Sequence, residues 1–229
     1  MPYVRPATER GRAQFGWLDS HHSFSFGNYY DPNHMGVSVL RVINDDRVDP
    51  GAGFGAHGHR DMEILSYVLE GEIEHRDSMG NIKRIPAGDF QIMSAGTGVM
   101  HSEYNASDTQ PLHFLQIWLL PNAMQVTPRY EQRAFARRPG GTAISHPEEP
   151  GAMQVHSDAR LWRYLGSNDR SNAEWTLVPQ GQQLYVHNVS GQIEVAGHIL
   201  NPGDGIALDD RSITLTGDAS AEALVFDLP

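Results

Sequence analysis

Short apolar runs separated by turns dominate this chain, and no stretch shows the sustained period of a long amphipathic helix. The segments 36–43, 63–69 and 112–120 are rich in apolar and β-branched residues, which is typical of strands. Because aspartate is disfavoured inside strands, Asp45-Asp46 is expected to end the first of them. A short helix could form only within residues 122–138. The pattern therefore predicts a mostly β protein.

The first 35 residues contain a run of polar and aromatic side chains. Residues 23–26 alternate between the two kinds, as a half-buried strand does, and residues 31–33 form a predicted turn around a proline. The aromatic side chains of this run have two interpretations, a packing edge or the wall of a pocket, and the sequence favours neither. They are Phe24, Phe26, Tyr29 and Tyr30.

The second half of the chain repeats the turn pattern of the first. The sequence GEIE at 71–74 is matched by GQIE at 191–194, and a Gly-Asp turn at 88–89 is matched by one at 203–204. Each match places a glycine turn inside a hairpin and a Gly-Asp turn before the next strand. Self-similarity of this kind indicates two copies of one supersecondary plan.

Two pairs of potential metal ligands, each spaced by one residue, lie in the first half. They are His57 with His59, and His101 with Glu103. Side chains two positions apart on a strand point to the same face, so each pair would project from one side of its strand. If the two strands are neighbours, three imidazoles and a carboxylate converge. That set is a first coordination shell for a transition metal.

We expect two domains, residues 1–135 and 136–229, joined by a stretch rich in proline and glycine. The second domain differs from the first where the ligands would stand. Its matching positions carry side chains that do not suit the same metal: Leu177, Pro179 and Thr216. The metal site is therefore predicted in the first domain alone.

Composition narrows the class of protein. Of the 229 residues 39% are hydrophobic and 20% charged, which fits a soluble globular protein. The formal net charge of −11 would repel phosphate backbones, which argues against direct binding of nucleic acid or anionic membranes. The absence of cysteine excludes disulfides and zinc–thiolate sites, and no apolar run approaches the ~20 residues of a membrane span. With no signal peptide apparent, we expect a cytoplasmic protein.

Longer motifs surround the ligand pairs. They are HSFSFG at 22–27, GFGAHGHRDMEI at 53–64, LEGEIEHRDSMGN at 69–81, AGDFQIMSAGTGVMHSE at 87–103 and LVFDLP at 224–229. The second and fourth resemble the two cupin motifs, and together the five resemble the pirin family. The chain looks most like the bacterial members described as quercetin 2,3-dioxygenases.

The resemblance implies an all-β bicupin, with two antiparallel β-barrels of the cupin or jelly-roll kind, few short helices, and metal only in the N-terminal barrel. The family's four ligands fall on His57, His59, His101 and Glu103, all of which are present. This set is the same as the one that the spacing predicts.

Glu63 has three interpretations. The corresponding glutamate binds metal in many cupins, and alternation from His59 would place it on the same face. In pirins Glu103 takes the carboxylate position, which favours a supporting or structural role for Glu63, because a fifth ligand would leave little room for substrate. The third interpretation is a buried carboxylate that accepts backbone hydrogen bonds.

The remaining histidines lack a paired ligand in sequence, so surface or hydrogen-bonded structural roles are expected for them. They are His75, His146, His156, His187 and His198. His113 lies in an apolar strand and could face either side.

Three imidazoles and a carboxylate, without sulfur, suit Fe(II), Mn(II), Co(II), Ni(II), Cu(II) or Zn(II). The family resemblance favours Fe(II), and the donor set alone does not separate these ions.

The first functional hypothesis is a dioxygenase that uses O2 to cleave the central ring of flavonols such as quercetin, with release of carbon monoxide. Glu103 would take the 3-hydroxyl proton while the metal acts as a Lewis acid. The second is a metal-dependent redox-sensing or interaction protein without turnover, because eukaryotic pirins are described as nuclear cofactors of transcription; such a protein would have a protein partner. The third keeps the dioxygenase but gives it another enol or diketone substrate.

Overall fold

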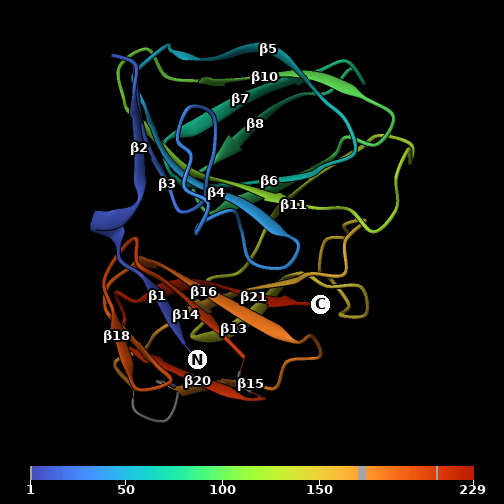
Figure 1. Ribbon diagram of the computed structural model, residues 1–229. Helices are drawn as coiled ribbons and strands as arrows, with labels where there is room; N and C mark the ends of the chain where they lie inside the picture. The colour runs from blue at the N-terminus through green and yellow to red at the C-terminus, as the bar shows by residue number, and fades with distance from the viewer. Residues whose placement is uncertain (1, 170–173, 210) are drawn as a thin grey trace.

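Four antiparallel sheets make up the computed structural model, which describes residues 2–169, 174–209 and 211–229 (Figure 1). Two of the sheets face each other in an upper, N-terminal unit, and the other two do so in a lower, C-terminal unit. The single helix among the described residues is a 3-10 turn, η1 (Ala7–Glu9). The predicted all-β fold is confirmed, and each unit is a pair of facing sheets rather than the closed barrel that the resemblance implied.

The N-terminal unit contains a seven-stranded and a four-stranded sheet. The seven strands, in spatial order, are β12 (Arg129–Ala134), β9 (Asp89–Ser94), β6 (Glu63–Glu70), β11 (Leu112–Leu119), β4 (Leu40–Val48), β3 (Leu18–His22) and β2 (Gly11–Gln14). The four are β5 (Gly53–His59), β10 (Val99–Asn105), β7 (Glu72–Asp77) and β8 (Ile82–Pro86).

The C-terminal unit has a six-stranded and a four-stranded sheet. The six are β1 (Tyr3–Arg5), β19 (Gly205–Leu208), β16 (Gln183–Ser190), β21 (Glu222–Leu228), β14 (Arg160–Leu165) and β13 (Gly140–Ser145). The four are β15 (Glu174–Leu177), β20 (Ile213–Gly217), β17 (Ile193–Val195) and β18 (His198–Leu200).

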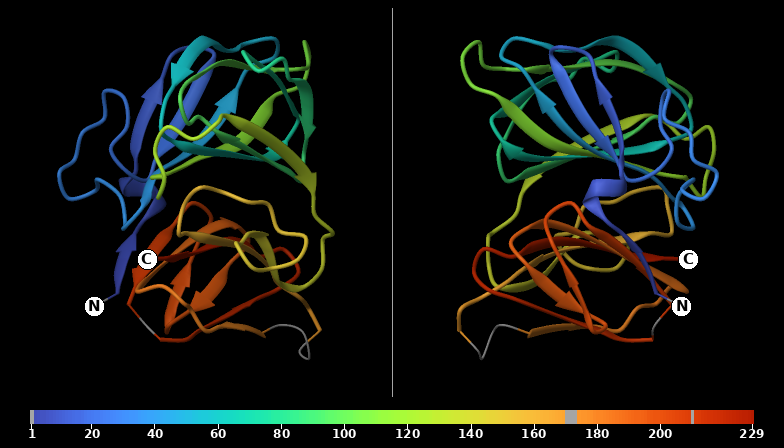
Figure 2. Two further views of the ribbon diagram at one scale, coloured as in Figure 1. Left: turned by 90° about the vertical axis from the view of Figure 1, so that its right-hand side faces the viewer. Right: turned by 60° about the vertical axis from the view of Figure 1, so that its left-hand side comes forward.

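The first strand of the chain belongs to the sheet of the second unit. β1 pairs with β19, and the chain then crosses through η1 to the upper unit (Figure 2). The Ala7 N–H donates a 2.7 Å hydrogen bond to Asp204, which fixes the crossing. Sheet membership also places β12 in the upper unit and β13 in the lower one, while the domain boundary at residue 135 stays a prediction.

Three local predictions are wrong. The strand predicted at 36–43 begins only at Leu40 and continues through Asp45-Asp46 to Val48. The strand predicted at 23–26 is instead a loop with one isolated bridge, between Phe26 and Tyr29. The helix considered within 122–138 is replaced by the edge strand β12. In each case pairing with neighbouring strands, or the lack of it, overrides local propensity.

The repeated glycine turn is present in both units. Gly71 joins β6 to β7 and Gly191 joins β16 to β17, with φ of 79° and 62°, a left-handed conformation that favours glycine. In both units the two joined strands belong to different sheets, so the predicted hairpin is wrong and the turn instead carries the chain from one facing sheet to the other. A Cβ would come within 2.6 Å of the Pro111 carbonyl oxygen at the first turn and 2.7 Å of the Ala221 backbone at the second. The predicted repeat thus has a steric basis at the same place in each copy.

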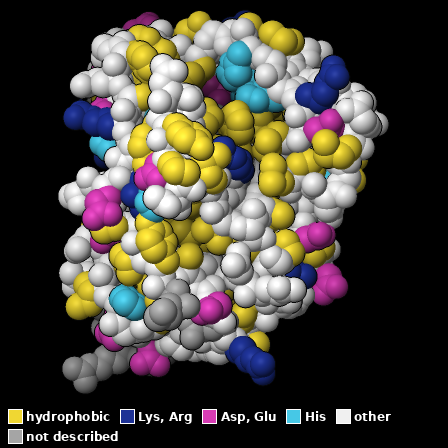
Figure 3. Space-filling model, viewed as in Figure 1, with side chains coloured by type: hydrophobic (Ala, Val, Ile, Leu, Met, Phe, Trp, Pro, Cys, Tyr) yellow, Lys and Arg dark blue, Asp and Glu magenta, His cyan; other side chains and the backbone are white. Residues whose placement is uncertain are grey.

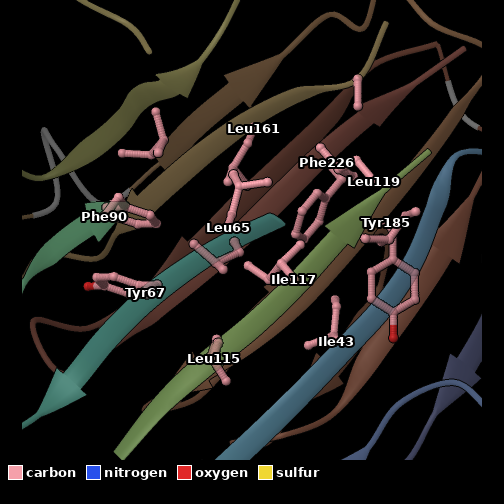
Figure 4. Packing of buried hydrophobic residues seen from close by; sticks show 14 of the residues in the cluster. Ile43, Leu65, Tyr67, Phe90, Leu115, Ile117, Leu119, Leu161, Tyr185 and Phe226 are labelled. Atoms are coloured by element: carbon pink, nitrogen blue, oxygen red, sulfur yellow. The ribbon is translucent and has the colours of Figure 1, made fainter. Parts of the chain in front are cut away.

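A hydrophobic core lies between the two units. Figure 4 shows Leu65 and Ile117 from the seven-stranded sheet facing Leu161 and Phe226 from the six-stranded sheet. All four side chains are fully buried. The facing sheets therefore form a continuous apolar interior across the domain boundary. Each Å² of apolar surface buried there stabilises the folded state by about 25 cal/mol.

Phe226 tests how strongly this interface stabilises the fold. We expect Phe226→Ala to lower the free energy of unfolding by about 3–5 kcal/mol, since the cavity would open in a core shared by both units. Phe15→Ala removes the same side chain at a site that is 59% exposed and should change stability by no more than about 0.5 kcal/mol. Urea denaturation of both variants measures the difference. Equal losses would contradict a shared core.

Candidate metal centre and adjoining cavity

Three of the four predicted ligands meet at one point. β5 and β10 are antiparallel neighbours in which His57 lies directly opposite His101. The ring centroids of His57, His59 and His101 lie 4.4–4.9 Å apart. The Nε2 atoms of His57 and His101 are 3.0 Å apart. The predicted convergence of the two pairs on adjacent strands is therefore present for the imidazoles.

The tautomer of His57 suits metal binding. Its Nδ1–H donates a 2.8 Å hydrogen bond to the carbonyl oxygen of Gly55, which leaves the Nε2 lone pair directed at His101. A metal-bound histidine typically donates its second ring N–H to such an acceptor, and the bond fixes the orientation of the ring. The local β5 backbone thus holds this imidazole ready for a cation.

Burial keeps the other two imidazoles neutral. Burial, together with the neighbouring His101 and His57, lowers the pKa of His59 to about 4, against the opposing effect of Glu103. Burial likewise lowers the pKa of His101 to about 4, against the opposing effect of Glu103. Since a neutral imidazole is the form that coordinates metal, both side chains are ready to bind at neutral pH.

Glu103 lies one β-bulge further along β10, at the point where the register with β5 shifts. It is 2% exposed, and it joins a second group of potential ligands with His101 and His75, whose donor atoms lie within 4.8 Å of one another. Its assignment as fourth ligand and as catalytic base stays a prediction. Its placement in the cavity wall next to His101 makes both roles geometrically accessible.

A row of polar side chains crosses the interior of the first domain on five adjacent strands. Directly paired positions carry it from β3 through β4, β11 and β6 to β9: His22, Asn44, Gln116, Ser66 and Gln91. His22 donates a 2.7 Å hydrogen bond to Asn44. We call these five residues the polar row. It crosses an inner face that also carries apolar side chains such as Leu18 and Phe114.

Three members of the polar row hold Glu103. Gln91 Nε2 donates to Glu103 Oε1 at 2.8 Å, and Gln116 Nε2 donates to Oε2 at 2.8 Å. Ser66 Oγ lies 3.1 Å from Oε1 as a third donor. A buried carboxylate needs such partners, because an unpaired one would change its protonation state rather than remain charged. The row therefore fixes the carboxylate in one orientation.

His75 is a functional-site residue that the sequence analysis missed. It is fully buried on β7, directly opposite Glu103, and its ring lies 5.5 Å from that of His101. Its Nε2–H donates to Asp77 at 3.0 Å. This contact fits the hydrogen-bonded role expected for it, while its closeness to His101 and Glu103 was not expected. The available signal was its position two residues after Ile73, which points it inward with that apolar side chain.

The other histidines lie outside this cluster. His146 accepts hydrogen bonds from two backbone N–H groups, and His113 faces the domain interface, where it donates to Asp45 at 2.6 Å. His187 is fully buried in the second domain, and burial lowers its pKa to about 4. Hydrogen-bonded structural roles were the expectation for His146, and its contacts confirm that interpretation.

Glu63 is held by partners of its own. It is 1% exposed and accepts hydrogen bonds from Ser94 Oγ at 2.7 Å and the His156 backbone N–H at 3.1 Å. It belongs to neither group of potential ligands among the described residues. The contacts fit the interpretation of a buried carboxylate that accepts backbone hydrogen bonds.

A cavity of about 540 Å³ opens beside the imidazoles, within the size range of small-molecule sites. Figure 3 shows histidines beside hydrophobic side chains on the upper, N-terminal unit. The aromatic run at the N-terminus divides between the two roles considered for it. Phe26 and Tyr29 line the cavity, Phe24 is part of the interdomain core, and Tyr30 is 72% exposed.

Comparison with known proteins identifies the family. The model of the pirin family matches residues 4–119, and the model of the quercetinase C-terminal cupin domain matches residues 142–228. The chain belongs to the pirin family. The predicted resemblance is thereby confirmed, and it extends over both units of this pirin.

Individual relatives support the assignment to the pirin family. The chain is 49% identical to the quercetin 2,3-dioxygenase of Escherichia coli K12, over all of this chain and 99% of that one. It is 37% identical to a pirin-like protein of Caulobacter vibrioides, over 97% of each. The crystal structure of the E. coli bacterial pirin YhhW in complex with nickel(II) superposes with a TM-score of 0.93 at 48% identity, covering 100% and 99% of the two chains. This pirin is thus quercetin 2,3-dioxygenase-like along its whole length, as predicted.

The side chains present fit a divalent transition metal. Three imidazoles and a buried carboxylate supply nitrogen and oxygen donors, and the Nδ1 of His101 is a buried atom without a partner among the described residues. Within the described ranges no helix has the length and apolarity to span a bilayer.

Replacing both histidines of β5 tests the site. We expect His57→Ala/His59→Ala to lose bound metal, because two of the three imidazoles in the cluster disappear. His198→Ala, in β18 of the second domain, removes an imidazole outside the cluster and should retain full stoichiometry. Elemental analysis after nickel loading and desalting measures both. Full stoichiometry in the double variant would show that the cation binds elsewhere.

The lowered pKa values predict a weak pH dependence of metal affinity. Two imidazoles with the usual pKa of ~6.5 would cost roughly fiftyfold or more in affinity between about pH 7 and about pH 5.5, because protons compete with the metal. Since His59 and His101 titrate near 4, their combined contribution over that window should be less than about twofold. Nickel dissociation constants of wild type, His59→Asn and His101→Asn, compared over the same pH window, isolate the contribution of these two imidazoles. A steep loss that disappears in these variants would contradict the prediction.

Proposed function

We propose that this pirin is a metal-dependent dioxygenase that cleaves the central ring of flavonols such as quercetin with O2 and releases carbon monoxide. The observation that carries the proposal is a cluster of three imidazoles beside an aromatic-lined cavity, with His57 of the cluster and the hydrogen-bonded carboxylate of Glu103 in the cavity wall. The full-length similarity to proteins named quercetin 2,3-dioxygenase supports the reaction class.

His57, His59, His101 and Glu103 would hold the metal in this proposal. We assign Fe(II) as the native ion, with Ni(II), Cu(II), Co(II), Mn(II) and Zn(II) as alternatives that the donor set also accepts. When bound, such an ion acts as a Lewis acid toward the substrate's enol oxygens and supplies the redox chemistry of dioxygen.

Glu103 would accept the proton of the flavonol 3-hydroxyl. The carboxylate forms part of the cavity surface, and its charged form is stabilised by donors from Gln91 and Gln116. The same donors prevent rotation of the carboxylate, so that it stays aligned while the proton moves. Loss of the proton leaves the enolate, which is the electron-rich form that reacts with oxygen.

Aromatic side chains would bind and shield the flat substrate. Phe26 and Trp118 line the cavity and pack edge to face at 5.3 Å. Trp118 also lies 5.1 Å from His59, so it connects the apolar wall to the cluster. Such a wall excludes water from the reacting atoms and contributes stacking energy to binding.

Other parts of the functional hypothesis stay predictions. They include a different enol or diketone as the physiological substrate, a redox-sensing role with a protein partner, the absence of nucleic-acid and membrane binding, and a cytoplasmic location. The first two compete directly with quercetin cleavage, so the assay of turnover decides between them and the proposal.

Aerobic turnover tests the proposal. We expect iron-loaded wild type to consume quercetin and O2 with release of carbon monoxide, and His101→Ala to be slower by at least about a hundredfold because the cluster is broken. His198→Ala should match wild type. Loss of the visible absorbance of quercetin, an oxygen electrode and carbon monoxide capture by haem measure the three quantities. Equal rates for wild type and His101→Ala would reject the assignment.

A further inference from the structure

Asp46 has a buried oxygen with no partner, in the wall of the cavity. The residue lies on β4, is 3% exposed, and lines the cavity with its neighbour in the polar row, Asn44. Its Oδ1 accepts no hydrogen bond from any described residue. An unpaired buried oxygen is costly, so its position beside a cavity of ligand size indicates a binding role.

Strand alternation explains why Asp46 faces the cavity. Asn44, Asp46 and Val48 share the inner face of β4, whereas Asp45 points to the domain interface and binds Arg10 at 3.2 Å. Asp46 therefore lies on β4 between the polar row and the apolar cluster that includes Val48.

Several other polar side chains around the cavity have partners. His22 and Asn44 bind each other, Gln116 binds Glu103, and Arg12 binds Asp19 at 2.7 Å. One further lining atom is unpaired, the indole N–H of Trp118, whose ring contacts His59 on the metal side. Asp46 thus supplies the unpaired acceptor of the cavity, at a residue outside both groups of potential ligands.

The protonation of Asp46 extends what it can bind. Burial, with smaller effects from the charges of Asp45 and Glu103, raises its pKa to about 7 against the opposing effect of a hydrogen bond with Ser20. A carboxyl group that is partly protonated at neutral pH can both donate to and accept from a hydroxyl group. It also avoids placing a second full negative charge beside Glu103.

We propose that Asp46 determines substrate specificity by hydrogen bonding a hydroxyl group of the flavonol other than its metal-binding oxygens. This rests on the proposed function. The apolar walls accept any flat ring of suitable size, whereas a buried polar group left unpaired penalises ligands that lack the matching hydroxyl. Flavonols with hydroxylated outer rings would be selected over the unsubstituted 3-hydroxyflavone, which has the metal-binding oxygens alone.

Ligand binding in the absence of oxygen tests this without turnover. Nickel-loaded protein would be titrated anaerobically with quercetin and with 3-hydroxyflavone, for wild type, Asp46→Leu and Asp46→Asn. We expect wild type to bind quercetin about tenfold or more tightly than 3-hydroxyflavone, and Asp46→Leu to lose that preference by weakening quercetin alone. Asp46→Asn keeps a donor and an acceptor and should retain part of it. Asp49→Leu, at an exposed carboxylate just beyond β4, should behave as wild type.

The outcomes separate the inference from the proposed function. Equal weakening of both ligands in Asp46→Leu, or no weakening of either, would overturn the role of Asp46 whether or not quercetin is cleaved. Selective binding without aerobic cleavage would overturn the dioxygenase and leave the specificity role standing. Failure of wild type to bind either flavonol would overturn both. Nickel stoichiometry and near-ultraviolet circular dichroism show that each variant is folded, and Asp46→Asn carries the test if Asp46→Leu is not.

Discussion

The hydrogen bonds to the buried carboxylate of Glu103 constrain the whole first domain. Removing a charged group from water costs several kcal/mol unless its oxygens are satisfied. Ser66, Gln91 and Gln116 provide those partners from three adjacent strands. Their three side chains reach the same carboxylate only because β9, β6 and β11 pair in a single register. The candidate metal centre therefore depends on the alignment of a sheet that carries none of its three imidazoles.

The same register builds the contact between the domains. Each polar-row residue on these strands is flanked by apolar neighbours that face the other way, such as Leu65 beside Ser66 and Ile117 beside Gln116. A slip of one residue would turn the amides toward the second domain and the leucines toward the metal. The hydrogen bonds to Glu103 and the apolar contact between the domains thus both follow from the same strand register. The second domain has no comparable polar row among its described residues, and its interior is filled by an apolar cluster that includes Val186 and Leu215.

Asp45 and Asp46 are adjacent on β4, and their side chains point to opposite faces of the sheet and have different environments. Asp45 faces the interface, where Arg10 and His113 hold it charged and its pKa lies well below the ordinary value. Asp46 faces the cavity, where burial raises its pKa to about 7. The Asp45-Asp46 dipeptide, which was expected to end the strand, is tolerated because Asp45 has hydrogen-bonding partners in Arg10 and His113 and Asp46 need not be fully charged.

The sequence by itself determined the all-β fold, the pirin resemblance, the repeated turns and the two ligand pairs His57/His59 and His101/Glu103, because motifs, strand periodicity and i, i+2 spacing are local properties. Only the tertiary structure decided the rest. The strand through Asp45-Asp46, the inward place of His75, the partners of Glu103 and the division of the aromatic run all depend on which strands are neighbours. Those pairings join segments far apart along the chain, so no single stretch of sequence carries the information that fixes them.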